Sequence, residues 1–400
     1  MTTRDQAQKL EMRAAFWAMG ASTRLEVKLG ALVSRTAGRA DRQEWTDLDV
    51  LAIHYIPMTG LSFTVADCKT SRGRVAERLF WLRGVMDLFG AHAGYLVRDE
   101  ALPPASRQLA LRLGVSAMDR ADREALLQQV GISRPQAGSF FDGSAHEART
   151  RLLASLPSDF DRMRRYRETG YWLAPSHRNL TGLPGQLSAV SDKLNPRSRT
   201  TMALTTDLAW LYLLAMIRAV DEMARLQLAD LDVGLAQVVI GDERERREKT
   251  FLAEQLQRLF EQLPARGQRI PTVDLVPPYY ADLADLAYRV SRRRAHALEA
   301  LRVLEFVGVE TIAAGGQKLA DLPEPPSPFA VKLASDVIRF LRRASGLSEE
   351  IVSTFDRLTT THETESRETT SEGRAQPDSG LSQTRLFDEQ KQPAERGPHQ

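Results

Sequence analysis

Three ionisable side chains on two apolar segments have the types and spacing needed for joint chemistry. Asp49 lies in the segment 46–53 (TDLDVLAI), and Asp67 and Lys69 end the segment 65–69 (VADCK). If both segments are strands, side chains two residues apart share a face, so Asp67 and Lys69 project together, as do Asp47 and Asp49. In an antiparallel hairpin, Asp49 and Asp67 can then converge at one end of the strand pair.

Two carboxylates held close together repel each other unless a cation lies between them. Mg²⁺ suits such a pair, because it takes one or two carboxylates while keeping water and binding substrate phosphate oxygens. A metal held in this way acidifies a bound water and offsets charge on a phosphoryl group. We therefore expect Asp49 and Asp67 to bind Mg²⁺, with Mn²⁺ as a substitute, Lys69 to assist the attacking water, and Glu26 to support the site. The reaction that this set supports is phosphodiester hydrolysis.

The surrounding segments indicate a mixed α/β domain over residues 1–135. Apolar spacing predicts a helix over about 6–34, which would carry Glu26. The later elements are predicted from strand composition, turn residues and helical period. They are strands over 45–56 and 61–69 with a turn at 57–60, a helix over 75–89 closed by Gly90, a strand over 93–98, a helix to about 113, a strand over 115–118 and a helix through 127.

This order of elements resembles the core of the PD-(D/E)xK nuclease superfamily, in the restriction-endonuclease-like branch with Mrr-type enzymes and Holliday-junction resolvases. The matching residues are Glu26, Asp49 and the triplet 67–69 (DCK), within about residues 10–130. Leu48 stands where the family name has Pro, and Asp at position 67 is within the family's pattern. The resemblance implies a mixed sheet flanked by helices, Mg²⁺ as cofactor and DNA (less often RNA) as substrate. It also implies a role in DNA repair, restriction or phage defence, and a homodimer where two strands are cut.

Two other interpretations remain open. Acidic-x-Lys is a weak pattern by itself, because it also occurs at 26–28 and 389–391. Asp47 and Asp49 could be solvent-facing strand residues, with Lys69 a surface charge. Alternatively, the fold could be kept without catalysis, as a DNA-binding adaptor that docks on a sliding clamp or on a defence or repair complex.

Residues 143–357 have helical patterns almost throughout and predict an all-α domain. Its basic and aromatic residues are candidates for nucleic-acid contact, because Arg binds phosphates and aromatic rings stack on exposed bases. The candidates are Arg162, Arg164, Arg165, Arg167, Tyr171, Trp172, Arg292 and Arg293. The alternative is a solvated helix face whose two aromatic residues are anchored in the core.

Residues 358–400 contain few large apolar side chains and predict a disordered tail. Within it, Gln383, Leu386 and Phe387 resemble the bacterial sliding-clamp-binding peptide, which has Gln, two variable residues, Leu and Phe. Such a segment can insert its apolar pair into a groove while Gln makes polar contacts. The clamp is therefore an expected partner.

The composition excludes several other classes. Lys and Arg number 54 against 52 Asp and Glu, so the net charge of +2 does not by itself indicate a polyanion partner. One cysteine excludes a disulfide framework and fits a reducing compartment, and the seven scattered histidines argue against zinc. The apolar stretch 202–217 contains Asp207 and is too short and too charged to span a membrane. Because the N-terminus also lacks an apolar signal core, we expect a cytoplasmic protein with no membrane segment.

Overall fold

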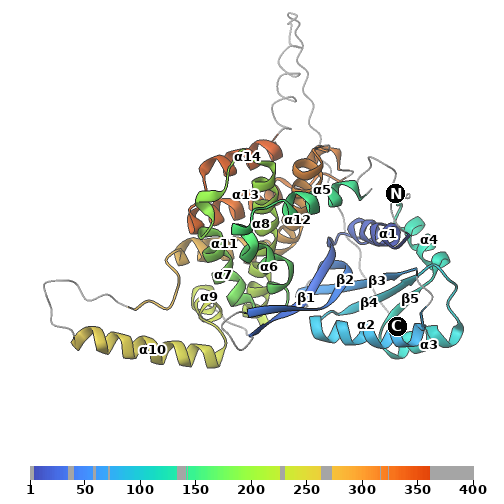
Figure 1. The fold of residues 1–400 in the computed structure, drawn as a ribbon, viewed down its shortest axis with the longest axis horizontal. Coiled ribbons are helices and arrows are strands. Elements are labelled where there is room, and N and C mark those ends of the chain that lie inside the picture. The colour runs from blue at the N-terminus through green and yellow to red at the C-terminus, as the bar shows by residue number, and fades with distance from the viewer. Residues whose placement is uncertain are drawn as a thin grey trace, which may run out of the picture. The chain divides into compact units, whose positions relative to one another are not determined.

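A mixed sheet lies at the centre of the N-terminal region (Figure 1). The computed structural model describes residues 4–34, 40–56, 60–70, 73–132, 141, 143–225, 230–262, 273–315, 317–322 and 324–360. Among these residues, the sheet has five strands whose order in space is their order in the chain. They are β1 (Ser22–Ser34), β2 (Ala40–Ile56), β3 (Gly60–Lys69), β4 (Ala93–Arg98) and β5 (Ser116–Met118).

The sheet changes from antiparallel to parallel pairing at β3. β1 pairs with β2 and β2 with β3 in antiparallel register, with Leu25 opposite Val50 and Val50 opposite Ala66. β4 and β5 run parallel to β3. Parallel neighbours need a crossover, and the helices α2 (Val75–Phe89) and α3 (Pro104–Arg112) supply the two crossovers.

β1 corrects the helix predicted over residues 6–34. Helix α1 spans Arg4–Ala18, and Gly20 follows it with a φ of +85°, a conformation that suits glycine. Leu25 and Leu29 fit a helical repeat, but with Val27 between them they fit a two-residue alternation equally well. Because residues 22–34 find their backbone partners on β2, Glu26 lies on a strand and not on a helix.

The other predicted helices and strands of this region are confirmed, and most of the turn predicted at 57–60 lies outside the described residues. The helix over 75–89 and the strand over 93–98 match α2 and β4, and the strands over 45–56 and 61–69 match β2 and β3. Gly90 has a φ of +76° and donates its backbone N–H to the Met86 carbonyl at the end of α2. Helix α4 (Arg120–Gln129) follows β5 and ends the α/β region.

Apolar side chains alternate between the two faces of the sheet. Val50 and Ala66 belong to a buried cluster with residues of α1, whereas Leu51 and Val65 belong to a larger cluster that includes residues of α2. Both faces are therefore covered, and Figure 1 shows α1 and α2 on opposite sides of the sheet. This arrangement explains why β2 and β3 are almost continuously apolar.

The region after residue 143 is mostly helical, as predicted. Its elements are α5 (Ser144–Ala154), η1 (Ser158–Phe160), α6 (Asp161–Arg165), η2 (Tyr166–Gly170), α7 (Ser176–Ser188), η3 (Ser191–Lys193), α8 (Arg199–Arg225), α9 (Leu231–Ile240), α10 (Glu243–Gln262), α11 (Tyr280–Arg292), α12 (Arg294–Phe306), η4 (Val307–Ala314), η5 (Leu319–Asp321), α13 (Pro328–Ser345) and α14 (Glu349–Thr360). α14 therefore extends three residues into the tail predicted from 358. The remaining tail and its clamp-peptide residues, Gln383, Leu386 and Phe387, lie outside the described residues.

α8 is the central helix of this region. Within the described residues, it alone is long and apolar enough to cross a membrane by length and composition. Its most apolar window has a mean hydropathy of 1.4 and is 94% buried inside the protein. It thus contains the buried helix predicted over residues 202–217.

A cluster of buried charges connects the sheet to the helical region. Glu305 on α12 lies 3.4 Å from Arg24 of β1 and accepts a hydrogen bond from Arg149 of α5 at 2.9 Å. Asp207 on α8 pairs with Arg24 and lies 3.7 Å from Arg149. All four side chains are at most 6% exposed. The strand and three helices are therefore held by ion pairs that water barely reaches.

Two more arginines complete the cluster. Arg13 of α1 lies 3.5 Å from Glu305, and Arg167 donates to Asp207 at 2.7 Å. Burial alone would raise the pKa of Asp207 and Glu305, but the surrounding guanidinium groups outweigh it and lower both. Both carboxylates are therefore ionised at neutral pH.

Removing one carboxylate from this cluster should strongly destabilise the protein. Asp207→Asn keeps the side-chain shape but leaves buried guanidinium groups without their partner, so we expect a loss of about 3–5 kcal/mol in the free energy of unfolding. Denaturant unfolding measures this loss. Glu248→Gln is the control, because the exposed Glu248 pairs with Arg244 at the surface and should contribute less than about 1 kcal/mol. Equal effects of the two substitutions would contradict a structural role for the cluster.

Candidate active site

The carboxylates of Asp49 and Asp67 meet where the pairing of β2 with β3 ends. The last paired residues at this end are Val50 and Ala66. One residue further along β2, the Asp49 Oδ2 accepts the backbone N–H of Cys68 at 2.8 Å. Asp49 and Asp67 are each only 2% exposed. The antiparallel register thus brings the two predicted carboxylates together in a buried position.

Lys69 reaches both carboxylates. Its Nζ lies 3.5 Å from the Asp49 Oδ2 and 3.9 Å from the Asp67 Oδ1. Its side chain is 30% exposed, so the ammonium group borders solvent while the carboxylates do not. Lys69 therefore lies within ion-pair distance of both carboxylates that the sequence singled out.

Glu26 joins this group through Lys9, which the sequence reasoning missed. Continuing the β1–β2 register from Leu25 and Val50 puts Glu26 opposite Asp49. Lys9 of α1 lies 2.8 Å from the Asp49 Oδ1 and 3.2 Å from the Glu26 Oε1. Burial by itself lowers the pKa of Lys9. The two carboxylates, Asp49 above all, raise this pKa by more than burial lowers it, so the amine stays charged. No sequence pattern links positions 9 and 49, because the contact depends on how α1 packs.

Glu26 is held in an unusual backbone conformation. Its φ is +53°, in the left-handed region that a non-glycine residue rarely adopts. Its carboxylate lies 3.8 Å from Nε2 of His146 on α5, another residue that the sequence did not indicate. The contact with His146, together with Lys9, lowers the pKa of Glu26 to about 2, and burial lowers the pKa of His146.

Arg78 of α2 holds Asp67. Its Nε and Nη2 donate to the two carboxylate oxygens, and its guanidinium lies 3.5 Å from the centre of the Trp81 ring. Burial raises the pKa of Asp67, and the Arg78 charge opposes this only in part, so the net shift is upward. Arg78 is the residue that keeps this buried carboxylate in one orientation.

Two pockets open next to these charges. One, of about 360 Å³, is lined by Lys69, Arg78, Trp81 and Arg98 among others. The other, of about 310 Å³, is lined by Lys9, Glu26 and His146 among others. The side chains that contact Asp49 and Asp67 are therefore accessible, although the two carboxylates themselves are buried.

The donor chemistry fits Mg²⁺, with a competitor on each carboxylate. Two carboxylates suffice for Mg²⁺ when substrate oxygens and water complete the coordination. Among the residues that the structure describes, no group of three or more His, Cys, Asp or Glu is arranged to hold a metal ion. The oxygens of Asp49 and Asp67 contact Lys9 and Arg78, so an ion bound here has to displace a side-chain cation.

Two aromatic candidates and one arginine near residue 165 are largely inaccessible, which corrects the prediction that Tyr171, Trp172 and Arg167 contact nucleic acid. Tyr171 and Trp172 are buried, and the Tyr171 hydroxyl donates to the Leu211 carbonyl at 2.7 Å. Arg167 belongs to the buried charge cluster, and Arg164 pairs with Asp161. The aromatic residues anchor this segment in the core, as the alternative interpretation expected.

The remaining basic candidates are exposed. Arg162 and Arg165 lie on the surface of α6. Arg292 and Arg293 lie where α11 ends and α12 begins, and both side chains line a further pocket. These four residues are thus accessible to a partner.

The site should make the acid stability of the protein depend on Glu26. A carboxylate whose pKa is lowered stabilises the fold fully above its ordinary pKa of 4.5, and this stabilisation disappears as the pH falls toward about 2. We expect Glu26→Gln to be less stable than wild type at about pH 6, and the difference to shrink by about pH 3. Urea unfolding of both proteins across this range is the measurement. A difference that stays constant or grows on acidification would contradict the pairing of Glu26 with Lys9 and His146.

The arrangement can hold a hard cation, orient a water molecule and neutralise a phosphate. Two buried carboxylates and a partly exposed ammonium group meet at the end of two paired strands, beside a basic pocket.

Comparison of the chain with protein-family models, with curated proteins and with solved structures finds no match.

Proposed function

We propose that this protein is a metal-dependent nuclease that hydrolyses DNA phosphodiester bonds. We also propose that its α/β region has a restriction-endonuclease-like fold of the PD-(D/E)xK kind, and that the protein acts in DNA repair, restriction or phage defence. The observation that carries it is the meeting of Asp49, Asp67 and Lys69, with the ammonium group 3.5 Å and 3.9 Å from the two carboxylates. The antiparallel register of β2 and β3 produces this cluster.

Each residue has a distinct role in the proposal. Asp49 and Asp67 hold Mg²⁺ or Mn²⁺, which when bound acidifies water and offsets charge on the phosphoryl group. Lys69 orients the attacking water and stabilises negative charge on the phosphate, since its ammonium group borders both the carboxylates and solvent. Glu26 does not contact the metal in this proposal and instead helps to position Lys9, which also contacts Asp49.

The charge of the pocket beside Lys69 supports a polyanionic substrate. Lys69, Arg74, Arg78 and Arg98 line it, with Glu77 as the acidic residue. Clustered cations attract phosphates at short range even when the net charge of the whole protein is near zero. The phosphate backbone of DNA fits this surface, and Trp81 adds an aromatic ring at the same place.

Substitution of the site residues should abolish cutting. We expect Asp67→Asn and Lys69→Met each to lower the cleavage rate by about 100-fold or more, because each removes a group that acts on the attacking water or its metal. The assay is a panel of linear, nicked, branched, mismatched and single-stranded DNA with Mn²⁺. Lys28→Met, which removes an exposed lysine of β1 paired with Glu44, is the matched control and should cut normally. Unchanged cutting by both site variants would refute the proposal.

One observation favours a second candidate, a non-catalytic DNA-binding adaptor. Arg78 contacts both oxygens of Asp67, and Lys9 contacts Asp49, so the two carboxylates are neutralised by side chains alone. In an adaptor these ion pairs would be permanent and would stabilise the fold. Such a protein would bind DNA without cutting it and dock on a sliding clamp or on a defence or repair complex.

Metal binding separates the two candidates. For a nuclease we expect calorimetry with DNA present to detect Mn²⁺ binding to wild type, with the binding lost in Asp49→Asn. Arg78→Gln should bind Mn²⁺ more tightly than wild type, because the competing guanidinium group is absent. Absence of binding by both wild type and Arg78→Gln would favour the adaptor.

A further inference from the structure

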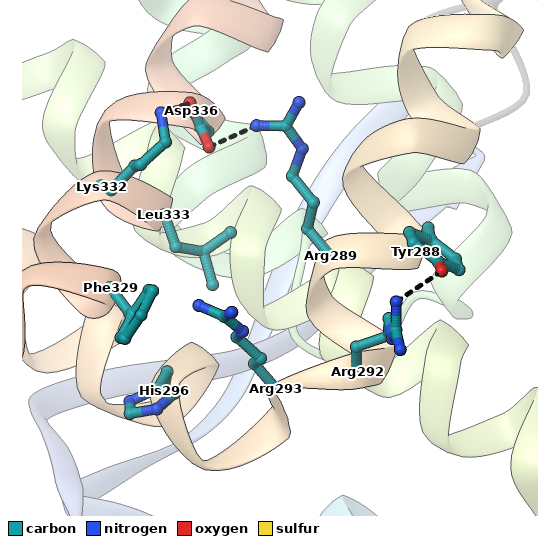
Figure 2. Close-up of a pocket in the computed structure, with 9 residues that line it drawn as sticks. All are labelled: Tyr288, Arg289, Arg292, Arg293, His296, Phe329, Lys332, Leu333 and Asp336. Atoms are coloured by element: carbon teal, nitrogen blue, oxygen red, sulfur yellow. Dashed lines mark hydrogen bonds and ion pairs between the residues drawn. The ribbon is translucent and has the colours of Figure 1, made fainter.

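A basic and aromatic pocket lies in the helical region, on elements that the candidate active site does not use. Its volume is about 520 Å³, and it lies between α13 and the junction of α11 with α12. Figure 2 shows the Arg293 side chain pointing toward Phe329 and Leu333 of α13, with Arg292 beside Tyr288 on the other side of the pocket. A pocket of this size matches a small-molecule or nucleotide site.

Two arginines at the junction have no acidic partner. Within the described part of the chain, neither Arg292 nor Arg293 forms an ion pair with a carboxylate. Arg292 donates instead to the Tyr288 hydroxyl at 2.8 Å, and the guanidinium of Arg293 lies 3.9 Å from the centre of the Phe329 ring. Other surface arginines of this region do have such partners, for example Arg342 with Glu349 and Arg343 with Asp282. The charge at the junction is therefore available to an anion.

The walls of the pocket are held by hydrogen bonds and ion pairs. The Ser327 hydroxyl contacts Nδ1 of His296 at 3.0 Å, and the Ser327 backbone N–H donates to Glu299 at 2.6 Å. These contacts tie the start of α13 to α12. On the other side, Asp336 accepts a hydrogen bond from Arg289 at 2.7 Å and lies 3.5 Å from Lys332 (Figure 2). The unpaired arginines are thus presented by a preorganised frame.

Two aromatic rings at the pocket are about half exposed. Tyr288 is 49% and Phe329 is 51% exposed, although rings of this size are normally buried. His296 lies beside Phe329, with ring centres 5.5 Å apart. Planar groups next to unpaired guanidinium groups form the combination on which nucleotide bases and phosphates bind together.

We propose that this pocket binds a nucleotide unit, with the phosphate on Arg292 and Arg293 and the base against Phe329 and Tyr288. Lys332 adds a further positive charge, and Asp336 is the acidic residue that lines the pocket. The nucleotide comes from single-stranded DNA or from a free nucleotide, which share this chemistry. If the ligand is single-stranded DNA, the inference rests on the proposed function, because the pocket would then hold a strand that the site on the sheet cuts.

The test measures binding without cutting. Full-length protein is titrated in EDTA into a fluorescent single-stranded oligonucleotide of about 15 nucleotides, and calorimetry follows the binding of free dTMP. We expect Arg292→Gln/Arg293→Gln to bind the oligonucleotide about tenfold more weakly. The slope of log K against the logarithm of the salt concentration should become smaller in magnitude by about 1.4. Phe329→Leu, which keeps an apolar side chain but removes the ring, should also weaken binding.

A second double variant controls for total charge. Arg244→Gln/Arg247→Gln removes two exposed arginines of α10 and should bind as wild type does. Loss of oligonucleotide binding alone identifies a DNA strand as the ligand, and loss of dTMP binding identifies a free nucleotide. The inference is overturned if the junction double variant matches wild type for both probes, or if the control is weakened equally. Because no step requires cleavage, an inactive nuclease site leaves this result unaffected, and a failure here leaves the cleavage result unaffected.

Discussion

The buried ion pairs between β1, α1, α5, α8 and α12 are the constraint on which the candidate site depends. Arg13, Arg24 and Arg149 bring their elements to Glu305 and Asp207 in surroundings that water barely reaches. The three elements that carry these arginines also carry a residue of the site, one helical turn or two strand residues away: Lys9 on α1, Glu26 on β1 and His146 on α5. Because an unpaired buried charge is costly, these elements have little freedom to shift. The cluster thus fixes the positions of the side chains that surround Asp49.

The site itself combines three carboxylates with three side-chain cations. Lys9 bridges Glu26 and Asp49, Lys69 lies near Asp49 and Asp67, and Arg78 holds Asp67 from α2. This balance offsets the repulsion between the acidic groups at the end of the strand pair. It also means that a divalent cation competes with Lys9 and Arg78 for the carboxylate oxygens. The affinity for metal therefore distinguishes the proposed nuclease from the proposed adaptor.

Two separate surfaces of the protein pair cations with an aromatic ring. On the sheet, Lys69 and Arg78 lie beside Trp81, and in the helical region Arg292 and Arg293 lie beside Tyr288 and Phe329. The first surface adjoins buried carboxylates, as the proposed hydrolysis of a phosphodiester requires. In the second, the junction arginines have no carboxylate partner among the described residues, which suits binding without reaction.

The sequence alone determined the strands β2 and β3, the helix α2 and the nearness of Asp49, Asp67 and Lys69, because alternation and hairpin register are local properties. It failed at residues 22–34, where Leu25 and Leu29 fit two periods and pairing with β2 decided between them. The sequence also did not predict the roles of Lys9, Arg78 and His146, because they enter the site only through the packing of α1, α2 and α5. Tyr171 and Trp172 show the same limit, because composition marked them as candidates and only the tertiary core made them inaccessible. Contacts between residues distant in the chain depend on how whole elements pack, and no short pattern records that.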